Sequence, residues 1–248
     1  MPTNKLIRIG TRNSALAMWQ ARHIASLLEA AGYSVEIIDI VTIGDKILDR
    51  SLSKIGAKGV FTEELETMLR NGEIDIAQHS AKDLPSTLAA DLPLIAFTKR
   101  EAAHDVVLSL NPDFRLAAEG AIVGTSSTRR RALLAKEYPQ HTLVEMRGNL
   151  QTRLEKLKSG ACDAMILAYA GVHRMGMESY IVEHLPIDTF TPAVGQGSVA
   201  IQSSSQLDPA LAIAIRQLCN DEPTEACLLA ERHLLAQLDG GCSVPVFG

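Results

Sequence analysis

Short apolar runs alternate with amphipathic segments along most of this chain. Runs of four to seven mostly apolar residues predict strands, and they are Leu6–Gly10, Val35–Val41, Ile74–His79, Leu94–Thr98, Ala121–Gly124, Leu143–Met146, Ala164–Ala168 and Val199–Gln202. Apolar residues at helical spacing predict helices over Ser14–Ala31, Thr62–Arg70, Ser127–Lys136, Leu150–Lys158, Pro209–Leu218 and Thr224–Leu238. This alternation predicts an α/β fold with a largely parallel sheet and helices on both of its faces.

Two segments, near residues 99–104 and 190–198, are typical of linkers, and the second is rich in Pro and Gly. Two crossings between halves predict a hinged pair of domains, like those of periplasmic binding proteins, with a ligand in the cleft between them. We expect a discontinuous domain 1 (residues 1–98 plus 197–218) and a domain 2 (residues 103–192). Residues 219–248 would form a C-terminal helix and a short tail.

Composition narrows the classes of protein. The 248 residues carry a net charge of −5, which argues against a nucleic-acid-binding protein. No apolar run reaches the length of a membrane span, and no secretory signal is visible at the N-terminus. Cys162, Cys219, Cys227 and Cys242 form no zinc-like pattern, so we expect a cytoplasmic protein with reduced thiols and no metal.

The segment Gly124–Arg131 lies where a strand should turn into a helix, and it holds Thr125, Ser127, Arg129 and Arg130. Hydroxyls and free N–H groups at a helix N-terminus bind anions, and arginine adds bidentate recognition of carboxylates. The alternative is a Ser N-cap followed by a solvated basic turn.

A second segment repeats this geometry: Arg147 and Gly148 end a strand, and Arg153 lies one turn into the next helix. The two arginines could converge on the same anion. The alternative is that Arg153 pairs with Glu145 or Glu155 at the surface, where such pairs contribute little.

A third segment, His79–Pro85, places Ser80, Lys82 and Asp83 at the end of a strand. A carboxylate there can balance a cation that forms on a substrate, or donate a proton. The alternative is an Asp that caps the following turn.

Two further features suggest a covalently loaded site. The glycine-containing stretch Thr42–Phe61 suits a lid, although a plain surface loop is the alternative. Cys242 follows Gly240 and Gly241, so something bulky could be bonded to its sulfur. The apolar patterns around the other three cysteines instead suit buried, inert thiols.

Together these segments resemble porphobilinogen deaminase, also called hydroxymethylbilane synthase. The motifs occur in order over nearly the whole chain: IGTRNSALAMWQA, VTIGDKILD, KIGAKGVFTEELE, DIAQHSAKDLP, GTSSTRRRALL, MRGNLQTRLEKL, DAMILAYAGVHRMG, PAVGQGSVAIQ and LDGGCSVPV. The resemblance implies a transferase that condenses four porphobilinogen molecules, with loss of ammonia, into the linear tetrapyrrole hydroxymethylbilane. It also implies a dipyrromethane cofactor in thioether linkage to Cys242.

The resemblance assigns roles to the motif residues. Asp83 matches the catalytic aspartate. The residues that match cofactor ligands are Ser80, Lys82, Asp83, Thr125, Ser127, Arg129, Arg130, Arg147 and Gly148. Those that match substrate ligands are Arg12, Ser14, Arg147, Arg153 and Gln196, while Lys54, Lys58 and Phe61 fall in the family's lid loop.

The chemistry of the substrate agrees with these roles, because each porphobilinogen carries two carboxylates and a growing chain needs many cations. We expect a monomer that binds neither nucleic acid nor membrane and hands its product to uroporphyrinogen-III synthase. Most family members continue past the cysteine into a third domain, so we expect this chain to lack most of it. A solute-binding protein, a regulator's effector domain and an inactive relative are the rival interpretations.

Overall fold

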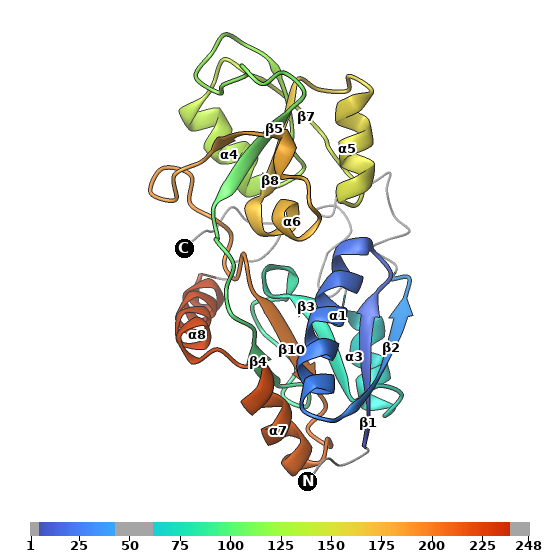
Figure 1. Ribbon diagram of the computed structural model, residues 1–248. Coiled ribbons are helices and arrows are strands. Elements are labelled where there is room, and N and C mark those ends of the chain that lie inside the picture. The colour runs from blue at the N-terminus through green and yellow to red at the C-terminus, as the bar shows by residue number, and fades with distance from the viewer. Residues whose placement is uncertain (1–4, 43–61, 239–248) are drawn as a thin grey trace.

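The computed structural model describes residues 5–42 and 62–238. Four of the expected site residues, Lys54, Lys58, Phe61 and Cys242, lie outside this range. The described chain forms two lobes, each built on a five-stranded sheet (Figure 1).

The first lobe has the strand order β2-β1-β3-β10-β4. Its strands are β1 (Leu6–Arg12), β2 (Ser34–Ile40), β3 (Ile76–Ser80), β4 (Leu94–Phe97) and β10 (Val199–Ser203). Its helices are α1 (Ala15–Ala30), α3 (Glu63–Arg70), the 3-10 turn η2 (Ala81–Asp83), α7 (Pro209–Cys219) and α8 (Glu222–Gln237). Apolar side chains of α1 and α7 pack on one face of the sheet, and those of α3 and α8 pack on the other.

The second lobe has the strand order β7-β6-β8-β5-β9. Its strands are β5 (Asp105–Ser109), β6 (Ile122–Gly124), β7 (Thr142–Val144), β8 (Ala164–Ala168) and β9 (Ile181–His184). Helix α4 (Thr128–Glu137) covers one face, and α5 (Leu150–Lys158) and α6 (Tyr169–Arg174) cover the other, while η3 (Glu178–Tyr180) precedes β9. Each lobe is therefore a three-layer α/β unit with its own core, as the sequence predicted.

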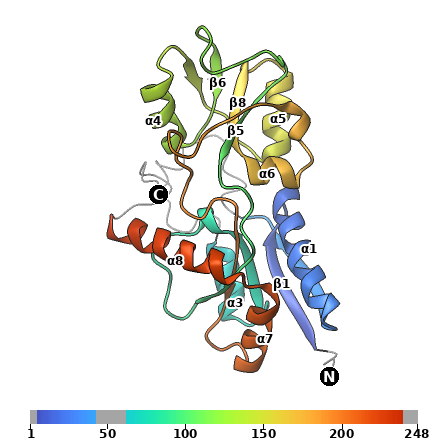
Figure 2. The same ribbon diagram turned by 60° about the vertical axis from the view of Figure 1, so that its left-hand side comes forward.

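Two chain segments that lie side by side connect the lobes (Figures 1 and 2). The Thr98 N–H donates to Val199 O at 2.9 Å and the Glu101 N–H donates to Gly197 O at 3.1 Å. Gly197 has φ +96°, and a Cβ there would lie 2.3 Å from Glu101 O. Only glycine allows this approach, which explains the Gly-rich segment that predicted the second linker.

Helix α8 lies against both crossings. Glu231 forms an ion pair with Arg100 of the first crossing, and its Oε2 accepts from the Gly195 N–H of the second at 2.9 Å. The lobes also touch directly, because the Arg174 guanidinium of α6 lies 5.4 Å from the Trp19 ring of α1 and donates to Gly197 O at 2.7 Å. Contacts from α8 and from α6 therefore hold the two crossings in place.

The expectation of largely parallel sheets is wrong. Four of the eight strand pairs are antiparallel, namely those that β10 makes with β3 and β4 and those that β5 makes with β8 and β9. The start of β10, Val199, pairs with the end of β3, Ser80. The second crossing thus enters its sheet from the edge where β3 ends, so β10 must run the opposite way.

Strands β5 and β9 were not among the predicted strands, and Cys227 departs from its prediction. Its side chain is exposed on α8, whereas Cys162 and Cys219 are buried as expected.

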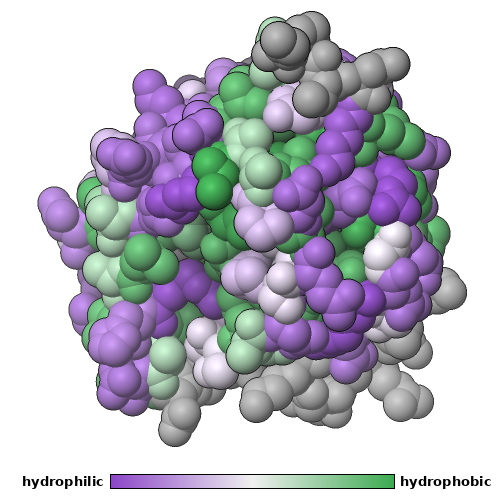
Figure 3. Space-filling model, turned by 90° about the horizontal axis from the view of Figure 1, so that it is seen from below, coloured by the Kyte–Doolittle hydropathy of each residue, from purple (hydrophilic) through white to green (hydrophobic). Residues whose placement is uncertain are grey.

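Seen from the end that the first lobe forms, the surface mixes hydrophilic and hydrophobic side chains (Figure 3). No helix in residues 5–42 and 62–238 is long and apolar enough to cross a membrane.

Candidate functional site

The polar motifs of both lobes meet at the hinge. In the first lobe, β3 runs into η2, which carries Lys82 and Asp83. In the second lobe, Ser127 caps α4, with its side chain accepting from the Arg130 N–H, and Asn149 caps α5, accepting from the Thr152 N–H. These caps place Arg129, Arg130 and Arg153 in the first turns of their helices.

Arg129 and Arg130 are buried and share one carboxylate, Asp105 of β5. Arg130 binds it through two nitrogens, with Nε 3.1 Å from Oδ2 and Nη2 2.8 Å from Oδ1. Arg129 Nη2 donates to Oδ2 at 2.6 Å. The side chain of Asp105 is fully buried, and the two guanidinium groups lower its pKa to about 2 despite the opposing effect of burial.

Gln196 of the second crossing joins the same cluster. Its Nε2 donates to Asp105 Oδ1 at 2.8 Å and to Ala103 O at 2.5 Å. Its own carbonyl oxygen accepts from Arg100 Nε at 2.8 Å. A continuous chain of polar contacts therefore runs from Glu231 of α8, through Arg100 and Gln196, to the arginines of α4.

Electrostatic interactions connect seven charged groups at this junction, five cations and two carboxylates, with a net formal charge of +3: Lys82, Arg129, Arg130, Arg147, Arg153, Asp83 and Asp105. Burial, reinforced by repulsion from Arg130 and Arg129, lowers the pKa of Lys82 to about 8. Burial and the neighbouring Arg130 and Arg147 lower the pKa of Arg153 to about 10. An excess of positive charge in a group that is buried at Arg129 and Arg130 and partly buried elsewhere is costly by itself and is relieved by a bound anion.

Several polar atoms at the junction are buried without a hydrogen-bond partner in the described part of the chain. They are Nε of Arg129, Nη1 of Arg131, Nη1 of Arg147 and Oε1 of Gln196. Buried polar groups are almost always satisfied in folded proteins. Three donors and one acceptor left open beside a cationic cluster therefore fit an anionic ligand that also carries an N–H group.

The structure decides two of the alternatives posed by the sequence. Arg129 and Arg130 do not belong to a solvated turn, because both are buried. Arg153 does not pair with Glu145 or Glu155; its Nε donates to Gly148 O at 2.8 Å, and Glu155 pairs with Lys158. No hydrogen bond to the Asp83 carboxylate forms within the described residues, so the capping role proposed for it has no support there.

The remaining expected ligands lie at strand ends or helix starts around this group. Ser80 Oγ exchanges hydrogen bonds with the Gln20 amide of α1 at 3.1 and 3.2 Å. Thr125 Oγ1 accepts from the Ser127 N–H at 3.3 Å, and Ser14 caps α1. Arg12 ends β1, and its charge adds to burial in lowering the pKa of His79.

Sequence reasoning missed three residues that organise the site: Asp105, Gln20 and Glu231. A signal existed for Asp105, since an aspartate that opens the apolar run Asp105–Ser109 is expected to be buried and paired. Gln20 and Glu231 lie in ordinary amphipathic helices, and only tertiary contacts give them their partners.

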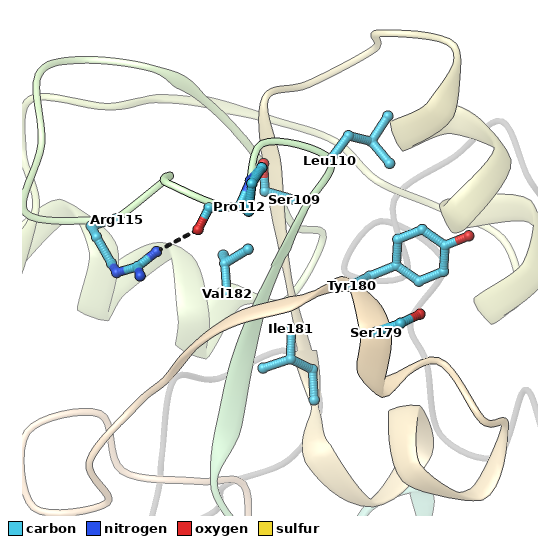
Figure 4. A pocket seen from close by; sticks show the side chains of 8 residues that line it. All are labelled: Ser109, Leu110, Pro112, Arg115, Ser179, Tyr180, Ile181 and Val182. Atoms are coloured by element: carbon cyan, nitrogen blue, oxygen red, sulfur yellow. Dashed lines mark hydrogen bonds between the residues drawn. The ribbon is translucent and has the colours of Figure 1, made fainter.

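The described cavities do not coincide with this cluster. One of about 360 Å³ lies at the opposite end of β5, lined by residues from Ser109 to Arg115 and from Ser179 to Val182 (Figure 4). A second, of about 560 Å³, adjoins it and also includes Ser109 and Leu110. Neither holds a residue of the cationic cluster, so the charge pattern and not cavity volume locates the site.

Comparison with known proteins identifies the family to which this chain belongs. A family model described as "Porphobilinogen deaminase, dipyromethane cofactor binding domain" matches residues 7–211. A porphobilinogen deaminase from Cytophaga hutchinsonii is 56% identical over 245 residues, which cover 98% of this chain and 78% of that protein. The chain belongs to the porphobilinogen deaminase family. A member from Desulfosudis oleivorans is 50% identical over 97% of this chain and 78% of its own length.

Membership of the porphobilinogen deaminase family gives the activity and the cofactor. The protein is a transferase that condenses porphobilinogen into the linear tetrapyrrole hydroxymethylbilane, and its cofactor is dipyrromethane.

The fold extends beyond porphobilinogen deaminases. The Bordetella pertussis BvgS VFT2 domain, in a double-mutant form, is similar with a TM-score of 0.53 and 16% identity over 91% of this chain and 92% of that one. The VFT2 domain without these changes gives a TM-score of 0.52. At this level of identity the likeness concerns the two-domain α/β fold alone, and it confirms the fold class predicted from the two linkers.

Proposed function

We propose that the cationic cluster at the hinge is the active site of this deaminase, with Asp83 as its catalytic residue. The observation that carries the proposal is the net charge of +3 of the group that contains Asp83, with buried N–H donors left open in that group. A substrate with two carboxylates on each pyrrole ring, and one ring N–H, complements such a site.

The described residues fit the dipyrromethane cofactor. Its carboxylates would be held by Arg129, Arg130, Lys82 and Arg147, with Ser80, Thr125, Ser127 and Gly148 at the adjoining strand and helix ends. The open Nη1 of Arg147 and the open Nε of Arg129 are donors of the type that a carboxylate accepts from. We propose Cys242 as the residue of attachment, because it is the cysteine of the motif LDGGCSVPV. When bound, the cofactor supplies the free pyrrole carbon to which the first substrate unit is joined.

The reaction requires three things of this chain. Arg12, Ser14 and Arg153 would orient the incoming porphobilinogen through its carboxylates, and the open Oε1 of Gln196 would accept from one of its N–H groups. The substrate's aminomethyl nitrogen is a protonated ammonium group, so when the C–N bond breaks the electron pair leaves with nitrogen as neutral ammonia and the positive charge remains on the pyrrole. The Asp83 carboxylate stabilises that charge through the ring N–H, and it accepts the proton released from the attacking carbon once the new C–C bond has formed. Lys54, Lys58 and Phe61 are proposed to belong to the loop over this site.

Several wider assignments are also proposals. The hinge contacts support domains at residues 1–98 plus 197–218 and 103–192, with 219–248 as a C-terminal unit. Unpaired Cys162, Cys219 and Cys227 support a cytoplasmic location. We also propose that the protein is a monomer and that its product passes to uroporphyrinogen-III synthase.

The intact mass of the purified protein tests the proposed function. We expect wild type to carry two porphobilinogen units less their ammonia, and Cys242→Ser to have the unmodified mass, because an alcohol is a much poorer nucleophile than a thiolate. Cys227→Ser is the matched control, since the Cys227 thiol is exposed and lies on α8. An unmodified wild type after incubation with porphobilinogen would instead favour a solute-binding role for this fold.

A further inference from the structure

Asp105 is the only carboxylate in direct hydrogen-bond contact with the arginines of the proposed site, within the part of the chain that the structure describes. Its two oxygens accept from Arg129 Nη2, Arg130 Nε, Arg130 Nη2 and Gln196 Nε2 at 2.6 to 3.1 Å. A carboxylate has about four acceptor positions, so Asp105 has none left for a ligand or for a proton. It therefore cannot take part in the chemistry, and its function must be exerted through its partners.

Asp105 occupies one edge of Arg130 and leaves other donors open. A guanidinium group carries five N–H groups. Arg130 donates two of these N–H groups to Asp105 and one to Ile166 O. Arg129 donates one to Asp105 and one to Thr191 O. These contacts leave two N–H groups of Arg130 and three of Arg129 unused, and the Nε of Arg129 is among them. Without Asp105, the two adjacent cations would repel each other and turn toward other acceptors.

Stability alone does not explain this arrangement. Burying an ionised carboxylate between arginines contributes little net stability, because desolvation offsets the attraction. The cluster also keeps an excess of cations, so complete neutralisation is not its purpose. Fixing the direction of open donors before a ligand arrives is what a buried, fully bonded counter-ion achieves.

Gln196 connects this orientation to the hinge. Its side chain binds Asp105 in the second lobe, while its backbone carbonyl accepts from Arg100 on the first crossing. Its neighbour Gly195 packs on the backbone of η2, because a Cβ at position 195 would lie 3.0 Å from the backbone nitrogen of Lys82. The same short segment thus contacts Asp105, the first crossing and the turn that carries Asp83.

We propose that Asp105 is a positioning residue for chain elongation, which holds Arg129 and Arg130 in the orientation that receives successive carboxylates and, through Gln196, keeps that orientation in register with Asp83. This inference rests on the proposed function of the arginine cluster. Asp105 would affect how Arg129 and Arg130 bind the intermediates, and not the bond-making step.

The test compares Asp105→Asn with Asp75→Asn in the full chain carrying its cofactor. Asp75 is a matched control, because it also binds one arginine through both oxygens, with Arg8 Nε at 3.1 Å and Nη2 at 3.0 Å, and lies outside the cluster. Each variant is mixed with porphobilinogen, quenched and weighed intact, so that the number of added units is read from the mass. Steady-state kcat and KM are measured in parallel.

We expect Asp105→Asn to retain cofactor, to accumulate species with few added units, and to lose about tenfold in kcat/KM, the effect of one misplaced charged hydrogen bond. Asp75→Asn should lower the melting temperature but give the wild-type distribution of intermediates. The proposal is overturned if Asp105→Asn matches Asp75→Asn in both distribution and kinetics. If Asp105→Asn does not fold, Gln196→Met keeps every charge and should show a milder stall, and a wild-type distribution in this variant equally overturns it. Failure of the proposed function is separate, since wild type itself would then gain no mass.

Discussion

At the scale of single residues, two carboxylates in one cationic cluster have different surroundings. Asp105 is fully buried and accepts hydrogen bonds from three side chains. Asp83 lies at the end of η2, partly exposed, with Lys82 beside it and Arg153 within electrostatic range. A carboxylate whose lone pairs are open can meet a substrate N–H, so these surroundings support the proposals of a catalytic role for Asp83 and a positioning role for Asp105.

Asp83→Asn should leave cofactor attached and slow every condensation. The amide keeps the shape of the side chain but removes the charge that stabilises the developing cation, a loss on the order of 3 kcal/mol, or about a hundredfold in kcat. Single-turnover rates with porphobilinogen measure this. A rate within a few-fold of wild type would mean that Asp83 has no catalytic role.

Lys82 should set the alkaline limit of activity. Its pKa is lowered to about 8, so the ammonium that would bind a carboxylate is lost as pH rises through 8. Lys82→Arg keeps a charge at all accessible pH values, so its kcat/KM should persist to higher pH than that of wild type. The stability of wild type should also rise between pH 8 and 10.5, because the unfolded lysine binds the proton more tightly there. Identical alkaline limbs in the two proteins would exclude Lys82 as the titrating group.

At the scale of elements, the second crossing is held against the turn that carries Asp83. Gly195 has φ +75°, and a Cβ there would lie 2.9 Å from the carbonyl carbon of Ala81. In helix α8, Glu231 Oε2 accepts a hydrogen bond from the Gly195 N–H, and Arg232 donates to Pro85 O at 2.8 Å. The second crossing and helix α8 therefore hold η2 and the residues after it in place.

Gly195→Ala should cost both stability and activity. A left-handed conformation costs an alanine about 1 to 2 kcal/mol, and the methyl group must also displace η2. Gly160→Ala is the matched control, because Gly160 has φ +79° with nothing within 4 Å of a Cβ. We expect similar strain in both variants but loss of activity only at position 195. Equal activity in the two, measured with melting temperatures, would show that the approach of Gly195 to η2 has no bearing on the site.

At the scale of the whole molecule, the site lies between two lobes with separate cores, so their relative placement rests on the two crossings, on α8 and on the contact of Trp19 with Arg174. Repulsion among the cations at the junction opposes this placement. A bound polyanion removes that repulsion and joins the lobes.

The protein with cofactor should therefore melt above the protein without it. A ligand bound only by the folded state adds roughly 3 kcal/mol at a hundredfold excess over its dissociation constant, and a shift on the order of 5 to 10 °C follows for a chain of this size. Calorimetry of wild type and Cys242→Ser, each with its mass verified, measures the difference. Coincident melting curves would show that the cofactor does not hold the lobes together.

The sequence alone determined the local features of this protein. Apolar runs located eight of the ten described strands to within two residues at each end, and the Asn149 cap lies where its side chain predicts. Local sequence is sufficient here because periodicity, caps and positive-φ glycines act within a few residues. The motifs also indicated the porphobilinogen deaminase family, and the comparisons confirmed it.

Only the tertiary structure decided the direction of β10 and β5, the burial of Arg129 and Arg130, and the exposure of Cys227. Asp105 and Arg130 are 25 residues apart and Arg100 and Glu231 are 131 apart. No local pattern encodes such pairings, because they depend on how elements far apart in the sequence pack together.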